Sequence, residues 1–167
     1  MFFNACKNDD PVIPNEEELI TTLNMTMISQ DMTDTVHYSF VDLDGDGGNK
    51  PIVMVSALKA NTTYSASLTL LNEVENPAED ITAEVIEEGD EHQVFYVLDG
   101  ANLTMIYDDM DKNGNPLGVK TTITTGAESN GTMKVILRHE PTKPNNGDPS
   151  SAEGETDIEV TFNVAIL

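Results

Sequence analysis

The chain has 167 residues, enough for one domain with a substantial hydrophobic core. Its 30 acidic residues outnumber its 8 lysines and arginines, and the resulting formal charge of −22 argues against nucleic acid as a partner, because phosphates would be repelled. The single cysteine rules out an intramolecular disulfide, and no apolar run is long enough for a membrane-spanning helix.

The first six residues contain a motif that resembles the end of a bacterial lipobox. In Phe3-Asn4-Ala5-Cys6, an apolar residue stands three positions before the cysteine and a small residue stands directly before it. In such signals the cysteine is lipidated and becomes the mature N-terminus. We therefore expect residues 1–6 to be a residual lipoprotein signal, with Cys6 as the lipidation site.

The residues after Cys6 resemble the short acidic signal that sends lipoproteins of Bacteroidota to the cell surface. This signal would be Lys7-Asn8-Asp9-Asp10, and Pro11 and Pro14 then favour a stiff polar linker. Residues 7–16 are expected to form a tether about 30 Å long, at about 3 Å per residue. The predicted location is the outer membrane, lipid-anchored and exposed on the cell surface.

Residues 17–167 are expected to form a single, mostly β domain. Apolar and polar residues alternate with a period of two, which is typical of half-buried strands. About nine strands separated by turn residues predict an antiparallel β-sandwich of the immunoglobulin-like or Greek-key type. The apolar run at 51–55 is consistent with a strand buried on both faces. The alternating positions include Leu19–Met27, Val36–Phe40, Tyr64–Leu70, Leu103–Tyr107, Val119–Ile123, Met133–Leu137 and Ile158–Ile166.

A single short helix is predicted near residues 77–88. Asn76 can cap it, Pro77 suits the first helical position, and Gly89 supplies a left-handed C-terminal cap. Ala78, Ile81 and Val85 would form its apolar face.

Two aspartate-rich loops are candidate calcium sites. Asp42, Asp44 and Asp46 have D-x-D-x-D-G spacing, and Asp109, Asp111 and Asn113 form a weaker copy. Neither loop is an EF-hand, because the flanks look like strands and position 12 is not glutamate. The alternative interpretation is a pair of tight turns built from residues that tolerate positive φ.

The three histidines, His37, His92 and His139, are alternative ligands for a transition metal or haem. They show no local metal-ligand spacing, but the ends of strands in a sandwich can converge on one rim. A structural or surface role is the alternative.

No catalytic motif is present: the chain has no nucleophile elbow, P-loop, dinucleotide fingerprint or H-E-x-x-H. We therefore expect a protein that is not an enzyme. The polar stretch 142–156 is predicted to be a long loop, of the kind used for binding.

Several segments together resemble a family of small acidic lipoproteins from marine and soil Flavobacteriia. Members are commonly labelled with a type 1 periplasmic-binding fold, which implies a doubly wound α/β domain, whereas the residue pattern here predicts a sandwich. The family's genes often lie beside those of outer-membrane TonB-dependent receptors. The matching segments are ACKNDD from Ala5, DLDGDGGNKP from Asp42, ALKANTTYSASLTLLNE from Ala57, NPAEDITAEVIEEGDEHQVFY from Asn76, GNPLGVKTTITTGAESNGTMKVILRHEP from Gly114 and GETDIEVTFNVAIL from Gly154.

The resemblance implies a surface-exposed lipoprotein that acts as a non-enzymatic ligand-binding or docking accessory of a TonB-dependent receptor. Two alternatives stay open. One is a structural or adhesive sandwich stabilised by Ca²⁺, and the other is a lipoprotein that captures a transition metal or haem.

Overall fold

The structure is a computed structural model that describes residues 18–45 and 47–167. The expected lipoprotein signal, the lipidation site Cys6, the tether at 7–16 and the candidate calcium ligand Asp46 lie outside the described residues. Within the described ranges, no helix has both the length and the apolar character needed to span a membrane.

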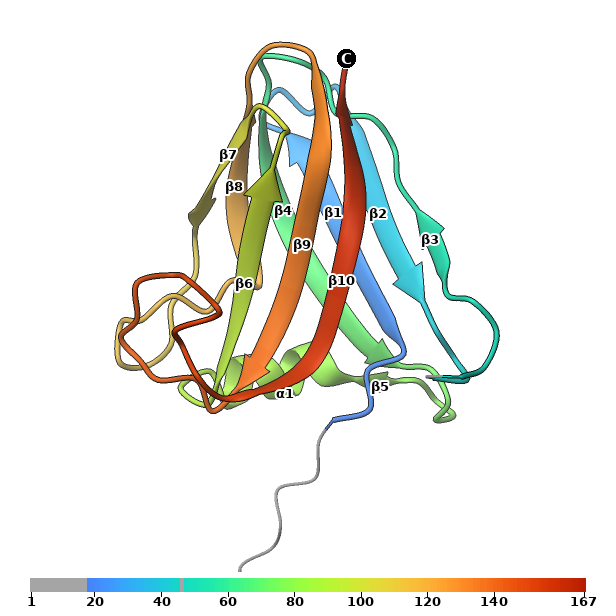
Figure 1. Cartoon of the computed structure of the whole chain (residues 1–167), viewed down its shortest axis with the longest axis vertical. Helices are drawn as coiled ribbons and strands as arrows, with labels where there is room; N and C mark the ends of the chain where they lie inside the picture. Colours follow the sequence, from blue (N-terminus) through green and yellow to red (C-terminus); the bar gives the residue numbers. More distant parts are fainter. Residues whose placement is uncertain (1–17, 46) are drawn as a thin grey trace, which may run out of the picture.

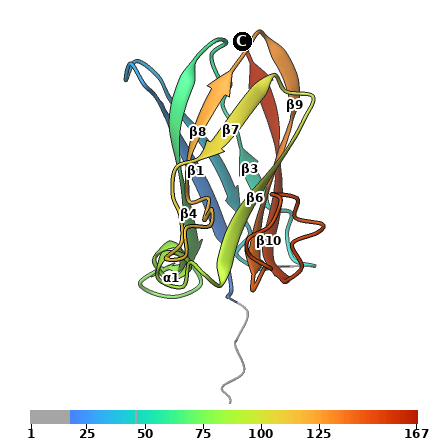
Figure 2. The same ribbon diagram turned by 90° about the vertical axis from the view of Figure 1, so that its left-hand side faces the viewer.

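Two antiparallel sheets face each other (Figures 1 and 2). The larger sheet has the strand order β3-β2-β1-β4-β8-β7, with the two-residue β5 paired to β4. Its strands are β1 (Thr22–Ser29), β2 (Thr35–Val41), β3 (Ile52–Met54), β4 (Thr63–Asn72), β5 (Glu79–Asp80), β7 (Leu103–Tyr107) and β8 (Lys120–Thr125). The smaller sheet has the order β10-β9-β6, formed by β6 (His92–Asp99), β9 (Ser129–His139) and β10 (Glu155–Ile166).

The strand order confirms the predicted sandwich and contains a Greek key. Strands β1, β2 and β3 are consecutive neighbours, and the chain then returns so that β4 pairs with the other side of β1. The resulting spatial order β4-β1-β2-β3 is that of a Greek key. All pairings between the named strands are antiparallel, unlike the parallel sheet of a doubly wound α/β fold.

The core lies between the sheets and is made by the alternation that the sequence displays. In β10, Ile158, Val160, Phe162, Val164 and Ile166 are buried, while the residues between them face outward. The rings of Tyr38 on β2 and Phe162 on β10 meet across the two sheets, with centroids 5.3 Å apart. This contact joins the sheets at the centre of the sandwich.

The predicted helix exists but is shorter than expected. Helix α1 spans Ile81–Glu87, and Asp80 rather than Asn76 caps it by accepting a hydrogen bond from the Thr82 N–H. The start differs because Glu79 and Asp80 pair with β4 as strand β5. The C-cap is Glu88, whose N–H donates to the Glu84 carbonyl, and Gly89 does not adopt the left-handed conformation.

The prediction for residues 51–55 is wrong in one respect: the segment is a strand, but it is exposed. Among the described strands, β3 pairs with β2 alone and forms an edge of the larger sheet. Ile52 and Met54 are 62% and 58% exposed, and Val53 and Val55 are also exposed. An apolar run without alternation therefore marks an edge strand here, not a central one.

Replacement of Phe162 by alanine tests the contact between the sheets. Because the ring is fully buried, Phe162→Ala should lower the free energy of unfolding by about 3–5 kcal/mol. Urea denaturation measures this loss. The neighbouring Thr161→Ala, on the exposed face of the same strand, should change stability by only about 0.5 kcal/mol. Equal losses in the two variants would contradict this assignment of the core.

Candidate metal centre

The fold brings two of the three histidines together and leaves the third apart. His92 begins β6 and His139 ends β9, and these residues are direct partners in the antiparallel ladder. Their rings stack, with centroids 4.8 Å apart and an interplanar angle of 16°. His37 lies on the exposed face of β2, where its Nδ1 is 3.2 Å from the Thr26 hydroxyl.

The His92 ring is buried, and its orientation is set by the end of helix α1. Only 1% of the side chain is exposed, and Nδ1 lies 3.3 Å from the Glu88 carbonyl oxygen. Since a carbonyl only accepts hydrogen bonds, Nδ1 must carry the proton in this contact, which leaves the lone pair on Nε2. Burial lowers the pKa of His92 below its usual value, with a further contribution from His139, so the ring is neutral at neutral pH.

The Nε2 atom of His92 points to the carboxylate of Glu18, just before β1. Nε2 lies 3.6 Å from Glu18 Oε1, beyond hydrogen-bond distance. Among the described residues, neither Nε2 nor Glu18 Oε2 has a hydrogen-bond partner, and both atoms are buried. Burial, followed by repulsion from Glu84, Asp157, Glu88 and Glu79, raises the pKa of Glu18 to about 7.

Glu88 completes a group of three potential metal ligands. One ligand atom from each of Glu18, Glu88 and His92 can be chosen so that all three lie within 4.8 Å of one another. A tetrahedral zinc site with bonds near 2 Å brings its ligand atoms to about 3.3 Å apart. The Glu18–His92 pair is already close to this spacing, and the Glu88 side chain is exposed and can adjust.

A second group lies on the other ring of the stack. Glu91, His139 and Glu140 also offer ligand atoms within 4.8 Å of one another. The two glutamates are exposed, whereas in the first group His92 is buried and Glu18 is largely buried. The arrangement resembles an ordinary acidic surface more closely than the first group does.

A buried lysine from the long loop supports the same end of the sandwich. The Lys143 ammonium donates hydrogen bonds to the carbonyls of Gly89 (2.6 Å) and His92 (2.5 Å) and to Asp111 Oδ2 (3.2 Å). The side chains of Lys143 and Asp111 are 5% and 0% exposed. Burial lowers the pKa of Lys143, but three acceptors surround its charge.

The carboxylate of Asp111 accepts several hydrogen bonds. Burial alone would raise the pKa of its carboxyl, but N–H groups of Asn115 and Asn113, together with Lys143, outweigh burial and lower the pKa to about 2. Asp109 likewise accepts hydrogen bonds from the N–H groups of Gly118 and Lys120. The carboxylates of this loop therefore stabilise a turn and hold Lys143.

The first aspartate-rich loop also has the hydrogen bonds of a turn. Asp42 accepts from the Gly45 N–H, and Asp44 accepts from the backbone and side chain of Asn49. Gly45 and Gly47 both have positive φ, which explains the need for glycine. Calcium binding by either loop stays a prediction. Among the described residues, the grouped metal-ligating side chains lie elsewhere.

The sequence reveals only part of this site. His92 and His139 are candidates because they stand at strand ends, but the register that stacks their rings has no local signal. Glu18 and Glu88 each belong to an acidic run and could not be distinguished from their neighbours. The sequence offers one weak indication that Lys143 has a specific role: it is the only basic residue in the polar stretch 142–156.

Comparison with known proteins finds no matching family model, no similar curated protein and no similar solved structure. Residue roles therefore come from the geometry of this chain alone.

The raised pKa of Glu18 predicts how Glu18→Gln changes stability with pH. The folded protein keeps the Glu18 proton up to about pH 7, whereas the unfolded chain loses it near pH 4.5. The contribution of Glu18 to stability therefore falls as pH rises from about 4.5 to 7 and is constant above that range. The glutamine variant, which stays neutral, should gain stability relative to wild type across this window.

Thermal melts of both proteins in EDTA, at a series of pH values, measure this difference. The two melting temperatures should be similar near pH 4 and should diverge up to about pH 7. A difference that does not change with pH would contradict the assignment of a raised pKa to Glu18.

Removal of the Lys143 ammonium tests how much its ion pair with Asp111 stabilises the fold. Lys143→Met should lower the free energy of unfolding by about 3 kcal/mol, because it leaves the Asp111 carboxylate buried without a cation. The double variant Lys143→Met/Asp111→Asn should recover part of this loss in urea denaturation. A double variant that is less stable than the single variant would show that Asp111 does not depend on the ammonium.

Proposed function

We propose that this chain is a non-enzymatic binding module that holds a divalent transition-metal ion with Glu18, Glu88 and His92. The observation that carries the proposal is the buried Nε2 of His92. It has its lone pair directed at Glu18, and no hydrogen-bond donor contacts it among the described residues. A cation bound there would accept electron density from the imidazole and neutralise the carboxylates.

The chemistry of the three ligands favours zinc or a similar ion over calcium. Imidazole nitrogen and carboxylate oxygen together suit Zn²⁺, Cu²⁺, Ni²⁺ and Fe²⁺, whereas Ca²⁺ prefers a shell of six to eight oxygens. The Glu88 carbonyl that orients His92 fills the role of the outer partner that commonly fixes a metal-binding histidine. Three protein ligands also leave a coordination position for water or for a carried ligand.

The setting proposed for this module is the one that the N-terminal motifs suggest. A lipid anchor at Cys6 and a tether at 7–16 would hold the domain at the outer-membrane surface, beside a TonB-dependent receptor. Glu18 follows closely after the end of this tether. The metal site would then lie at the end of the domain nearest the lipid, where the chain enters the first strand.

Titration with Zn²⁺ and Co²⁺ tests the metal site. Each ion should bind with a stoichiometry near one per chain at the principal site, raise the melting temperature, and release a proton from Glu18 near pH 7. Affinity should fall as pH drops below about 7, because protons then compete for Glu18. Calorimetry in buffers of different ionisation enthalpy measures both the affinity and the proton release.

Two conservative variants and one control locate the ion. Glu18→Gln and Glu88→Gln should each weaken binding by about tenfold or more, and Glu18→Gln should also abolish the proton release. His37→Ala, remote from the cluster on β2, should bind like the wild type. Equal affinity in all three variants, or no binding by the wild-type protein, would overturn the proposal.

A further inference from the structure

Strand β10 forms the edge of the smaller sheet, and only one end of this edge is covered. The strand pairs with β9 along its length. On its outer side, the Leu58 N–H donates to the Ala165 carbonyl, and the Leu167 N–H donates to the Leu58 carbonyl. Residues 58–60 therefore cover the C-terminal end of β10, while no other described strand pairs with its outer side.

The covered end shows which backbone groups of β10 point outward. Ala165 and Leu167 both bond to the segment outside the sheet, so the odd-numbered residues direct their N–H and C=O groups toward the edge. By the alternation of a strand, the same holds for Asn163, Thr161 and Glu159. The bulge between Thr156 and Ile158 limits this inference to the part of the strand after it. An exposed row of such groups is a template for another strand.

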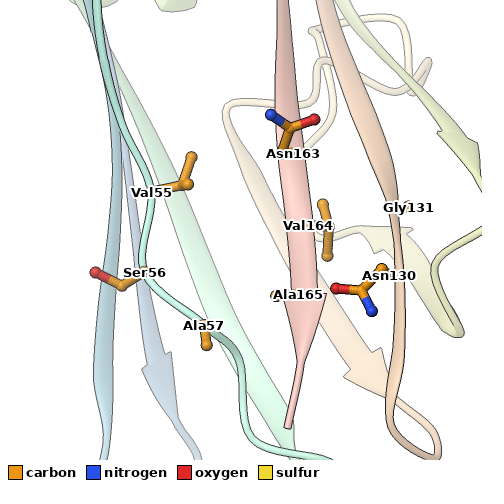
Figure 3. A pocket seen from close by; sticks show the side chains of 8 residues that line it. All are labelled: Val55, Ser56, Ala57, Asn130, Gly131, Asn163, Val164 and Ala165. Atoms are coloured by element: carbon orange, nitrogen blue, oxygen red, sulfur yellow. The ribbon is translucent and has the colours of Figure 1, made fainter.

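A groove begins where the covering segment departs from β10. It has a volume of about 370 Å³ and lies between residues 55–57 and strands β9 and β10. Figure 3 shows Val55 and Ala57 on one side of it, with Asn163 and Val164 of β10 on the other. The exposed apolar residues of β3 immediately precede this segment. The groove therefore combines an apolar wall with the unpaired edge of a sheet.

We propose that β10 binds one extended segment of a partner protein as an added strand, and that this segment alternates apolar and basic residues. The alternation follows from the two faces of β10. On the core side lie Val160, Phe162 and Val164, while Glu159 is exposed on the solvent side, beyond the bulge. Side chains of an added strand would lie beside those of β10 on each face.

The negative charge of the chain favours a basic partner segment. β10 contains three acidic residues and no basic one, although Lys134 of β9 forms an ion pair with Glu159. The whole chain carries a formal charge of −22, so a second copy would be repelled. Lysine or arginine on the solvent face of the added strand would instead be attracted to Glu159 and to the acidic chain as a whole. The proposed metal site uses none of these residues of β10.

Binding of a synthetic peptide tests the proposal directly. The probe is a short peptide of alternating valine and lysine, and the matched controls replace lysine by glutamate or methylate the backbone nitrogens. The lysine peptide should bind, with an affinity that falls as salt rises, and neither control should bind. Equal binding of the lysine and glutamate peptides would overturn the proposed partner chemistry.

Variants of Thr161 locate the peptide. Thr161→Pro removes an outward N–H without disturbing the pairing with β9, and should weaken binding by about fivefold or more. Thr161→Ala keeps the N–H and should bind like the wild type. Hydrogen exchange on the wild-type protein provides a second measurement that needs no variant. The peptide should protect the amides of Thr161 and Asn163, and their unchanged exchange when the peptide is bound would overturn the proposed site. Protection of these amides without peptide, in a dimer that forms as concentration rises, would replace the basic partner by a second copy.

Discussion

The excess of carboxylates over cations is the constraint on which this structure depends. Each carboxylate that folding removes from water needs a hydrogen-bond donor, a cation or a proton. Asp111 has backbone donors and the Lys143 ammonium, and Asp109 has two backbone N–H groups. Glu18 has no hydrogen bond to Oε2 within the described ranges, and its pKa is raised to about 7. Of these three carboxylates, Glu18 is the one whose surroundings fit a bound cation.

Much of the fold could be predicted because it depends on local patterns. Alternation in β4 and β10 identifies both the strands and their buried faces. The start of α1 could not be predicted, because Glu79 and Asp80 pair with β4 and the helix begins after them. Local capping signals carry no information about this contact between separate segments. The exposure of β3 also depends on contacts between segments, which the local sequence does not show. An apolar run does not reveal whether its strand has one neighbour or two.

The candidate site was harder to predict because its parts come from four separate segments. The site joins the start of β6, the end of β9, the C-terminal end of α1 and the segment that leads into β1, and these meet only after both sheets have formed. The sequence identified His92 and His139 as candidates by their residue type and by their places at predicted strand ends. Their stacking depends on the register of β6 against β9, and the choice of Glu18 among neighbouring glutamates depends on the packing of the two sheets.

The location of the site also gives metal binding a structural consequence. Glu18 leads into β1 of the larger sheet, whereas His92 belongs to β6 of the smaller one. At the opposite end of the sandwich, hydrogen bonds between residues 58–60 and the end of β10 already join the segment after β3 to the smaller sheet (Figure 1). An ion at Glu18 and His92 would provide the corresponding link at the end near α1, where the Glu18–His92 contact is too long for a hydrogen bond. Metal binding would then oppose separation of the sheets at that end, so local opening there should respond to the ion more strongly than the distant β10 edge does.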